Sequence, residues 1–134
     1  MSKIYGLKKT ERLKSRKKID ELFEKGKGFS VPPLRIIYTL EATKEFPQLQ
    51  VAVSAPKRNF KKAVDRNRLK RLLREAYRLN KKKLLTVAEE RKVGGTFFIN
   101  YTSKKMESFE MIAAAMIKAL RKLEQIINTH ESNS

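Results

Sequence analysis

The chain has 134 residues, enough for one domain with a buried core, and its 32 Lys and Arg against 14 Asp and Glu give a formal net charge of +18. Solubility does not need so much charge, which indicates a polyanionic partner such as nucleic acid or an anionic membrane surface. The lack of cysteine excludes disulfides, thiolate catalysis and cysteine-based zinc sites, and the single histidine, His130, gives little basis for histidine catalysis or a metal site.

The distribution of apolar residues along the chain predicts neither a membrane-spanning segment nor a secretory signal peptide. No apolar run approaches the ~20 residues that span a bilayer. The first residues carry Lys and Arg but no apolar stretch of the kind that signal peptides contain. The expected location is therefore the cytoplasm, or the nucleoid in a bacterium.

The first elements in chain order are a basic arm and a short helix. The arm is expected at residues 1–14, and Ser15 is the predicted N-cap of a helix that ends near Lys25, with Gly26 as its stop. Three apolar side chains share one face of this helix: Ile19, Leu22 and Phe23.

Strands are expected next. Gly28 and the Pro32-Pro33 pair predict an extended entry, and residues 34–42 (LRIIYTLEA) are rich in β-branched side chains, which favour a strand. Residues 48–55 form the next predicted strand, which Pro56 ends because proline cannot donate to a sheet.

A basic helix follows within residues 57–83, where 13 of 27 residues are Lys or Arg and only Asp65 and Glu75 oppose them. The helix is expected to start between Asn59 and Asp65 and to end by about Lys81. At ~100° per residue its apolar arc contains Leu69, Leu72, Leu73 and Ala76. The opposite arc contains Arg66, Asn67, Lys70, Arg71, Arg74 and Arg78.

The last predicted elements are a strand at residues 96–102 and a helix from Phe109 to about Asn128, capped by Ser108. Apolar residues at three- and four-residue steps give the helix a core-facing stripe. Residues 129–134 are expected to be a disordered tail. The chain is therefore predicted to be a single small α+β domain at residues 15–128, with the element order α-β-β-β-α-β-α.

The basic helix has three interpretations: a solvated charged face, a membrane-surface helix, or a nucleic-acid contact. Its near lack of carboxylates argues against the first, and its place between strands that need a cover argues against the second. A helix-turn-helix DNA reader needs a preceding helix, where this chain has strands. RNA-binding α+β domains often add aromatic side chains that stack on unpaired bases. The candidates, each with core burial as the alternative, are Phe23, Tyr38 and Tyr101.

One stretch of the basic helix resembles a known signature. Arg66-Asn67-Arg68, preceded by Ala63-Val64 and followed by Lys70-Arg71, Arg74 and Tyr77, resembles the "RNR" motif of the bacterial ribonuclease P protein subunit. The likeness extends over about residues 7–127. Lys61-Lys62 replaces the Gly-Asn pair common in the family, Pro56 replaces a small or β-branched residue, and Ile19 replaces a common Phe.

The resemblance implies a function as a subunit without catalytic or metal-binding residues of its own. In that family a catalytic RNA removes the 5′ leader of precursor tRNA, and the protein binds this RNA and holds the single-stranded leader between its first helix and its sheet. The resemblance also implies a left-handed crossover around the basic helix, and Mg²⁺ held mainly by the RNA. The expected partners are thus the catalytic RNA and the leader, with no membrane and no DNA.

The site residues follow from this resemblance. The residues expected to bind the catalytic RNA are Arg66, Asn67, Arg68, Lys70, Arg71, Arg74 and Arg78. Phe23 and Tyr38 are expected to stack on the leader, and Lys57 and Arg58 to neutralise its backbone. Arg71 is expected to pair with Glu75, four residues on. The alternatives are a ribosomal or other structural RNA-binding protein, a DNA-binding regulator, and a nuclease that acts alone.

Overall fold

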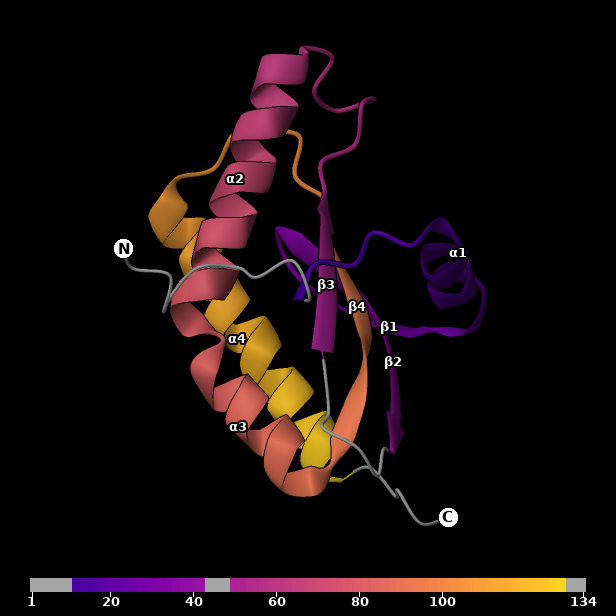
Figure 1. Ribbon diagram of the computed structural model, residues 1–134. Coiled ribbons are helices and arrows are strands. Elements are labelled where there is room, and N and C mark those ends of the chain that lie inside the picture. The colour runs from indigo at the N-terminus through magenta and orange to yellow at the C-terminus, as the bar shows by residue number, and fades with distance from the viewer. Residues whose placement is uncertain (1–10, 43–48, 130–134) are drawn as a thin grey trace, which may run out of the picture.

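A four-stranded sheet separates one helix from the other three in the computed structural model, which describes residues 11–42 and 49–129 (Figure 1). The elements are α1 (Arg16–Lys25), β1 (Lys27–Val31), β2 (Leu34–Ala42), β3 (Leu49–Ser54), α2 (Ala63–Asn80), α3 (Lys82–Arg91), β4 (Val93–Tyr101) and α4 (Phe109–Asn128). Most of the predicted arm and tail lies outside the described residues. The predicted α+β class and order are confirmed, with one further helix, α3.

Helix caps form where the sequence predicted them. The Ser15 hydroxyl accepts a hydrogen bond from the Lys18 N–H at 3.3 Å, and the Ser108 hydroxyl accepts one from the Met111 N–H at 3.2 Å. Each satisfies a backbone donor that the first turn of a helix leaves free.

The break between α2 and α3 is slight. Lys81, between the two helices, keeps helical backbone angles, and the Asn80 side chain donates to the Ala76 carbonyl at 2.8 Å. The sequence did not predict α3, because the three lysines after Asn80 interrupt the apolar pattern of a helix. The predicted order includes a strand before β2, but the sequence located it only as an extended entry; it is β1.

The core lies between the sheet and the layer formed by α2, α3 and α4. On β4, Phe97, Ile99 and Tyr101 are buried under these helices, and α2 covers them with four buried side chains: Leu69, Leu73, Ala76 and Tyr77. Three of these four belong to the apolar arc that the sequence predicted. The remaining member, Leu72, is half-buried.

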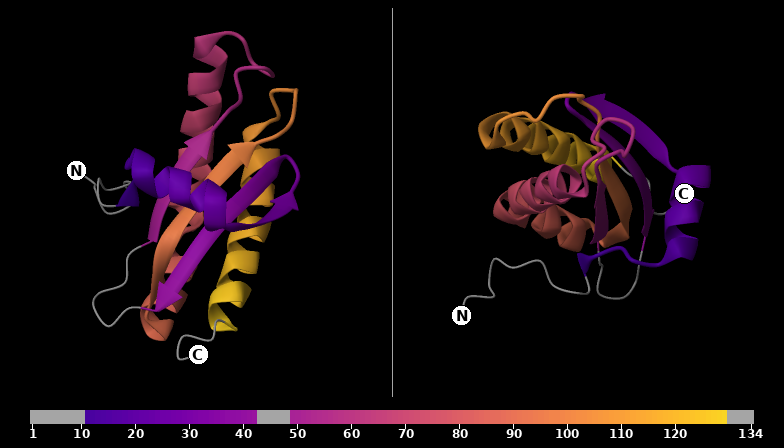
Figure 2. Two further views of the ribbon diagram at one scale, coloured as in Figure 1. Left: turned by 90° about the vertical axis from the view of Figure 1, so that its right-hand side faces the viewer. Right: turned by 90° about the horizontal axis from the view of Figure 1, so that it is seen from above.

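The sheet order is β1-β2-β4-β3, with β3 parallel to β4 and at the edge. Seen from the side of α1, β3 lies to the left of β4, and α2 and α3 lie behind the sheet (Figure 2). Because both strands run in the same direction, the connection from β3 through α2 and α3 to β4 is left-handed, as the resemblance implied and against the usual hand.

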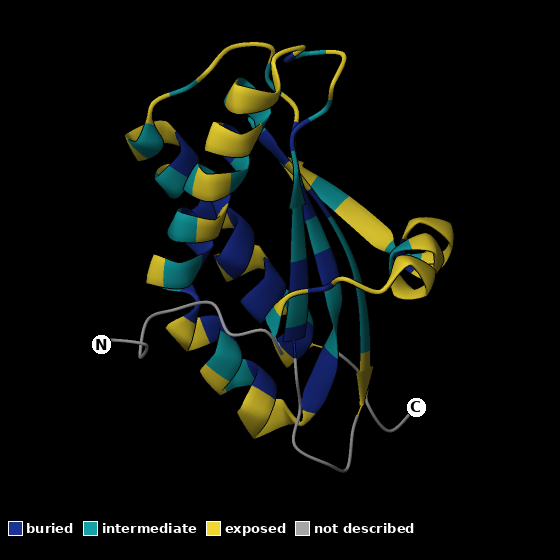
Figure 3. Cartoon of the chain, turned by 45° about the horizontal axis from the view of Figure 1, so that its top comes forward, coloured by how far each residue is buried: buried dark blue, intermediate teal, exposed yellow. Residues whose placement is uncertain are grey.

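Of the helices that the structure describes, α1 alone covers the opposite face of the sheet (Figure 3). Leu22 is fully buried there, whereas most of α1 is exposed (Figure 3). Gly26 allows the tight exit from this helix, because a Cβ atom at this position would lie 2.4 Å from the Leu22 carbonyl oxygen and 2.8 Å from Ile37 Cγ2. Since α1 covers only part of this face, side chains of β2, β3 and β4 beside it remain half-exposed.

Candidate nucleic-acid interface

The basic face of α2 is defined here as Arg66, Asn67, Arg68, Lys70, Arg71, Arg74 and Arg78. Asn67, Arg68, Arg71 and Arg74 are exposed, and the other three side chains are half-buried. The predicted division of this helix into an apolar and a cationic side is therefore present. Its exposed guanidinium groups can each present two parallel donors to a phosphate.

Arg66 differs from its neighbours because it binds the protein backbone. Its Nη1 donates to the carbonyl oxygen of Phe60 at 2.7 Å and to that of Lys61 at 2.8 Å. The Phe60 ring is buried, with its centroid 5.9 Å from that of Tyr101. Arg66 therefore holds the loop before α2 in place. The sequence led us to expect that Arg66 binds RNA, and it did not predict this structural role.

Glu75 also differs from the expectation. It pairs with Arg78 rather than with Arg71: Arg78 Nε donates to Glu75 Oε1 at 3.0 Å, and Nη2 donates to Oε2. This hydrogen bonding lowers the pKa of Glu75 and raises that of Arg78. The predicted pairing with Arg71 was wrong because an arginine three residues on competes for the same carboxylate.

Phe23 lies on the outer part of the α1 face and is 54% exposed. Its ring packs edge-on against Phe98 of β4, with 4.9 Å between the centroids. The sequence did not single out Phe98, because nothing in the run Phe97-Phe98 says which ring faces α1. The exposed side of Phe23 can stack on a base while Phe98 supports its edge.

Tyr38 does not join this aromatic pair, and its expected contact with the leader stays a prediction. Tyr38 lies opposite Phe97 in the sheet, on the side of α4, and its ring centroid is 6.0 Å from that of Phe29. Side chains alternate between the two faces of a strand, so Ile37 faces α1 and Tyr38 faces away from it.

Tyr101 is fully buried and unavailable for stacking. Its hydroxyl donates to the Lys105 carbonyl at 2.6 Å and accepts from the Glu107 N–H at 2.9 Å, which orders the loop before α4. Burial raises the pKa of this phenol. Core burial, the alternative that the sequence left open, is the correct interpretation for Tyr101.

Lys57 and Arg58 are exposed on a turn that follows β3. The Asn59 and Phe60 N–H groups both donate to the Pro56 carbonyl at 3.2 Å, which closes the turn. Ala52 pairs with Phe98 and Ser54 with Asn100 on the face toward α1. A strip of half-exposed residues therefore leads from the Phe23 ring along β3 and β4 to these two cations.

Neither a metal cluster nor a membrane span is found in the described part of the chain. No three His, Asp or Glu side chains gather there as metal ligands would. No helix among these residues is long and apolar enough to cross a membrane.

Comparison with known proteins shows the family of this chain. The family model described as Ribonuclease P matches residues 7–124, which include α1, the basic face and most of α4. The chain belongs to the ribonuclease P protein family. The ribonuclease P protein component of Porphyromonas gingivalis strain W83 is 42% identical over 116 residues, 87% of this chain and 85% of that protein. That of Clostridium botulinum is 30% identical over 114 residues, 85% of this chain and 95% of the relative.

Solved structures agree with this assignment. The RNase P protein from Thermotoga maritima has a TM-score of 0.60 and 25% identity, and the match covers 84% of this chain and 96% of that one. A Staphylococcus aureus RNase P protein has a TM-score of 0.61 at 19% identity, over 90% of this chain and 100% of that one, and shows the same fold.

Proposed function

We propose that this chain is the protein subunit of ribonuclease P, which binds the catalytic RNA and the 5′ leader of precursor tRNA and thereby assists endonucleolytic removal of the leader. The observation that carries the proposal is the row of exposed cations on α2, in a chain of this family. The RNA carries out the hydrolysis, and the protein alone is inactive.

The basic face of α2 binds the catalytic RNA through phosphate contacts. Arg68, Lys70, Arg71 and Arg74 supply charge, and the Asn67 amide can both donate and accept. Arg66 and Arg78 add charge while each also binds a group within the protein. Six such contacts give a slope of log affinity against log salt of roughly −4 to −5.

The leader lies on the α1 face of the sheet. Phe23 stacks on one base, which contributes about 1–3 kcal/mol, and Lys57 and Arg58 neutralise the backbone at the other end of the strip. Tyr38, the second ring expected to stack on the leader, lies on the other face of the sheet. Mg²⁺ is held mainly by the RNA, and the complex acts in the bacterial cytoplasm.

The test is cleavage of precursor tRNA by a bacterial ribonuclease P RNA at low magnesium, with and without this protein. Protein-dependent cleavage at the mature 5′ end supports the proposal. Tight RNA binding without any effect on cleavage, with a matched RNA, would favour a structural RNA-binding protein instead.

A further inference from the structure

Residues 11–13 are bound to Lys81, between α2 and α3, and to the edge of β3. The Leu13 N–H donates to the Val51 carbonyl at 2.9 Å, and Arg12 bridges to Val51 as a short parallel strand would. Both carboxylate oxygens of Glu11 accept from Lys81 Nζ at 2.9 Å. A backbone hydrogen bond and a side-chain ion pair thus hold this segment, and the two members of the ion pair lie 70 residues apart in sequence.

The ion pair between Glu11 and Lys81 is shielded from water. The side chains are only 14% and 10% exposed, respectively. Beside them the hydroxyl of Tyr77 is buried without a hydrogen-bond partner in the described structure, and burial together with the Glu11 charge raises the pKa of Tyr77. Removing one member of such a pair leaves a charge without compensation, so the pair fixes the segment firmly.

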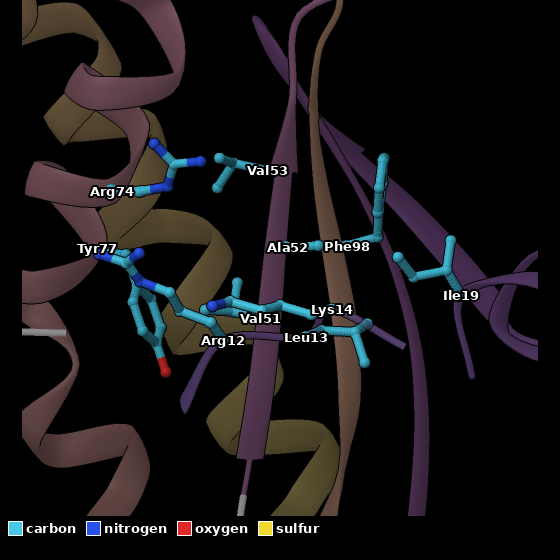
Figure 4. A pocket seen from close by; sticks show the side chains of 10 residues that line it. All are labelled: Arg12, Leu13, Lys14, Ile19, Val51, Ala52, Val53, Arg74, Tyr77 and Phe98. Atoms are coloured by element: carbon cyan, nitrogen blue, oxygen red, sulfur yellow. The ribbon is translucent and has the colours of Figure 1, made fainter. Parts of the chain in front are cut away.

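Arg12 is thereby brought to the same groove as Arg74. This groove, about 360 Å³ in volume, follows the edge of β3 (Figure 4). Arg12 and Arg74 lie on the side of α2, whereas Ile19 and Phe98 lie on the side of α1. Lys14 is a third cation in the lining, which contains no carboxylate.

The two guanidinium groups repel each other in this arrangement. Desolvation, and then the positive charge of Arg12, lower the pKa of Arg74. Among the described residues no ion pair compensates either group, since Glu11 binds Lys81. An anion between the two guanidinium groups would relieve this repulsion.

We propose that Arg12 and Arg74 together bind one backbone phosphate of an RNA strand at the edge of β3, and that the ion pair between Glu11 and Lys81 positions Arg12 for this contact. The inference rests on the proposed function. The groove joins the basic face of α2 to the α1 face, so the strand belongs to either the catalytic RNA or the leader. Planar guanidinium groups suit a phosphate diester because each can donate twice to its oxygens.

Arg12→Ala, Arg74→Ala and the double variant test the shared site, with Arg16→Ala as the control. Arg16 is exposed on α1, and its substitution by alanine removes the same charge at a position four residues from Arg12. Two affinities are measured: that of the protein for the catalytic RNA, and that of the holoenzyme for precursor tRNA with and without its leader. We expect Arg12→Ala to weaken one of them about tenfold, as loss of a charged hydrogen bond does, and Arg16→Ala to change neither by more than about twofold.

The assay that weakens identifies the source of the phosphate. A loss with the catalytic RNA alone assigns it to that RNA, and a loss confined to leader-bearing substrate assigns it to the leader. The double variant should lose less than the product of the single losses, because the two side chains share one ligand. Equal effects of Arg12→Ala and Arg16→Ala, or strictly multiplicative losses, would overturn the site.

Glu11→Gln separates positioning from net charge. It raises the net charge by one, so long-range attraction alone predicts tighter RNA binding, whereas loss of the anchor for Arg12 predicts weaker binding. Tighter binding would overturn the positioning role. Thermal unfolding checks that Glu11→Gln is folded. If Glu11→Gln is unfolded, Arg12→Ala still tests the site, because this variant keeps the ion pair between Glu11 and Lys81. Failure of the proposed function would instead appear as unmodified protein that does not support cleavage.

Discussion

Arg66 provides a sharp test because its neighbour Arg68 carries the same charge with a different environment. Arg66→Ala removes two hydrogen bonds from a charged donor to the carbonyl oxygens of Phe60 and Lys61, at 2.7 and 2.8 Å. Arg68 is exposed on the same helix. The two variants therefore have equal net charge but should differ in stability.

The expected loss of stability comes mainly from the bond to Phe60, which is partly buried, since that to Lys61 is exposed. Hydrogen bonds to charged groups contribute about 1.5–3 kcal/mol each, and exposure reduces this. We expect Arg66→Ala to lower the free energy of unfolding by about 1–3 kcal/mol and Arg68→Ala by less than about 0.5 kcal/mol. Urea unfolding, followed by circular dichroism, measures both.

Limited trypsin digestion gives a local measurement of the same effect. The loop held by Arg66 contains four possible cleavage sites: Lys57, Arg58, Lys61 and Lys62. Cleavage there should be faster in Arg66→Ala than in Arg68→Ala, because the loop opens more often. Arg66→Lys keeps the charge but lacks the planar fork, so it should restore only part of the resistance. Equal stability and equal digestion of the two alanine variants would refute the role of Arg66.

Three further predictions follow from the site and the core. Phe23→Ala should weaken holoenzyme binding of leader-bearing precursor by about tenfold and leave leaderless tRNA unchanged, and an equal loss for both would contradict stacking on the leader. Arg68→Ala combined with Arg71→Ala should reduce the salt slope of catalytic-RNA binding by roughly 1.4–1.8, and an unchanged slope would exclude these phosphate contacts. Because burial raises the pKa of folded Tyr77 above the ordinary value of about 10, the unfolded chain loses this proton first as the pH rises. The free energy of unfolding, measured in urea, should therefore fall above about pH 10 and fall less in Tyr77→Phe; equal pH dependence of both proteins would contradict it.

The elements that the sequence predicted well are long and periodic. Both α2 and α4 bury the apolar stripe that their spacing indicated, and β2 has the predicted bounds. In β2, however, Ile36, Ile37 and Tyr38 are all large and apolar, so alternation alone cannot say which face each one takes. The sequence therefore could not say which face of the sheet Tyr38 takes.

Contacts between distant residues were beyond the reach of local patterns. Glu75 has an arginine at both i−4 and i+3, and only the folded geometry selects Arg78. In the sequence, α1, three strands and α2 lie between Glu11 and Lys81, and no periodic pattern links the two residues. The role of Arg66 depends on the path of a loop whose residues differ from the family pattern.

The central claim is that the basic face of α2 meets the catalytic RNA while the α1 face meets the leader. Because the chain has no cysteine, Val64→Cys on α2 and Glu24→Cys beside Phe23 can each carry a single photo-crosslinker at an exposed position outside the proposed contacts. In the holoenzyme with precursor tRNA, the probe at residue 64 should crosslink to the catalytic RNA and that at residue 24 to the leader. Crosslinks from residue 24 that are the same with leaderless tRNA, or from residue 64 to the leader alone, would contradict the account.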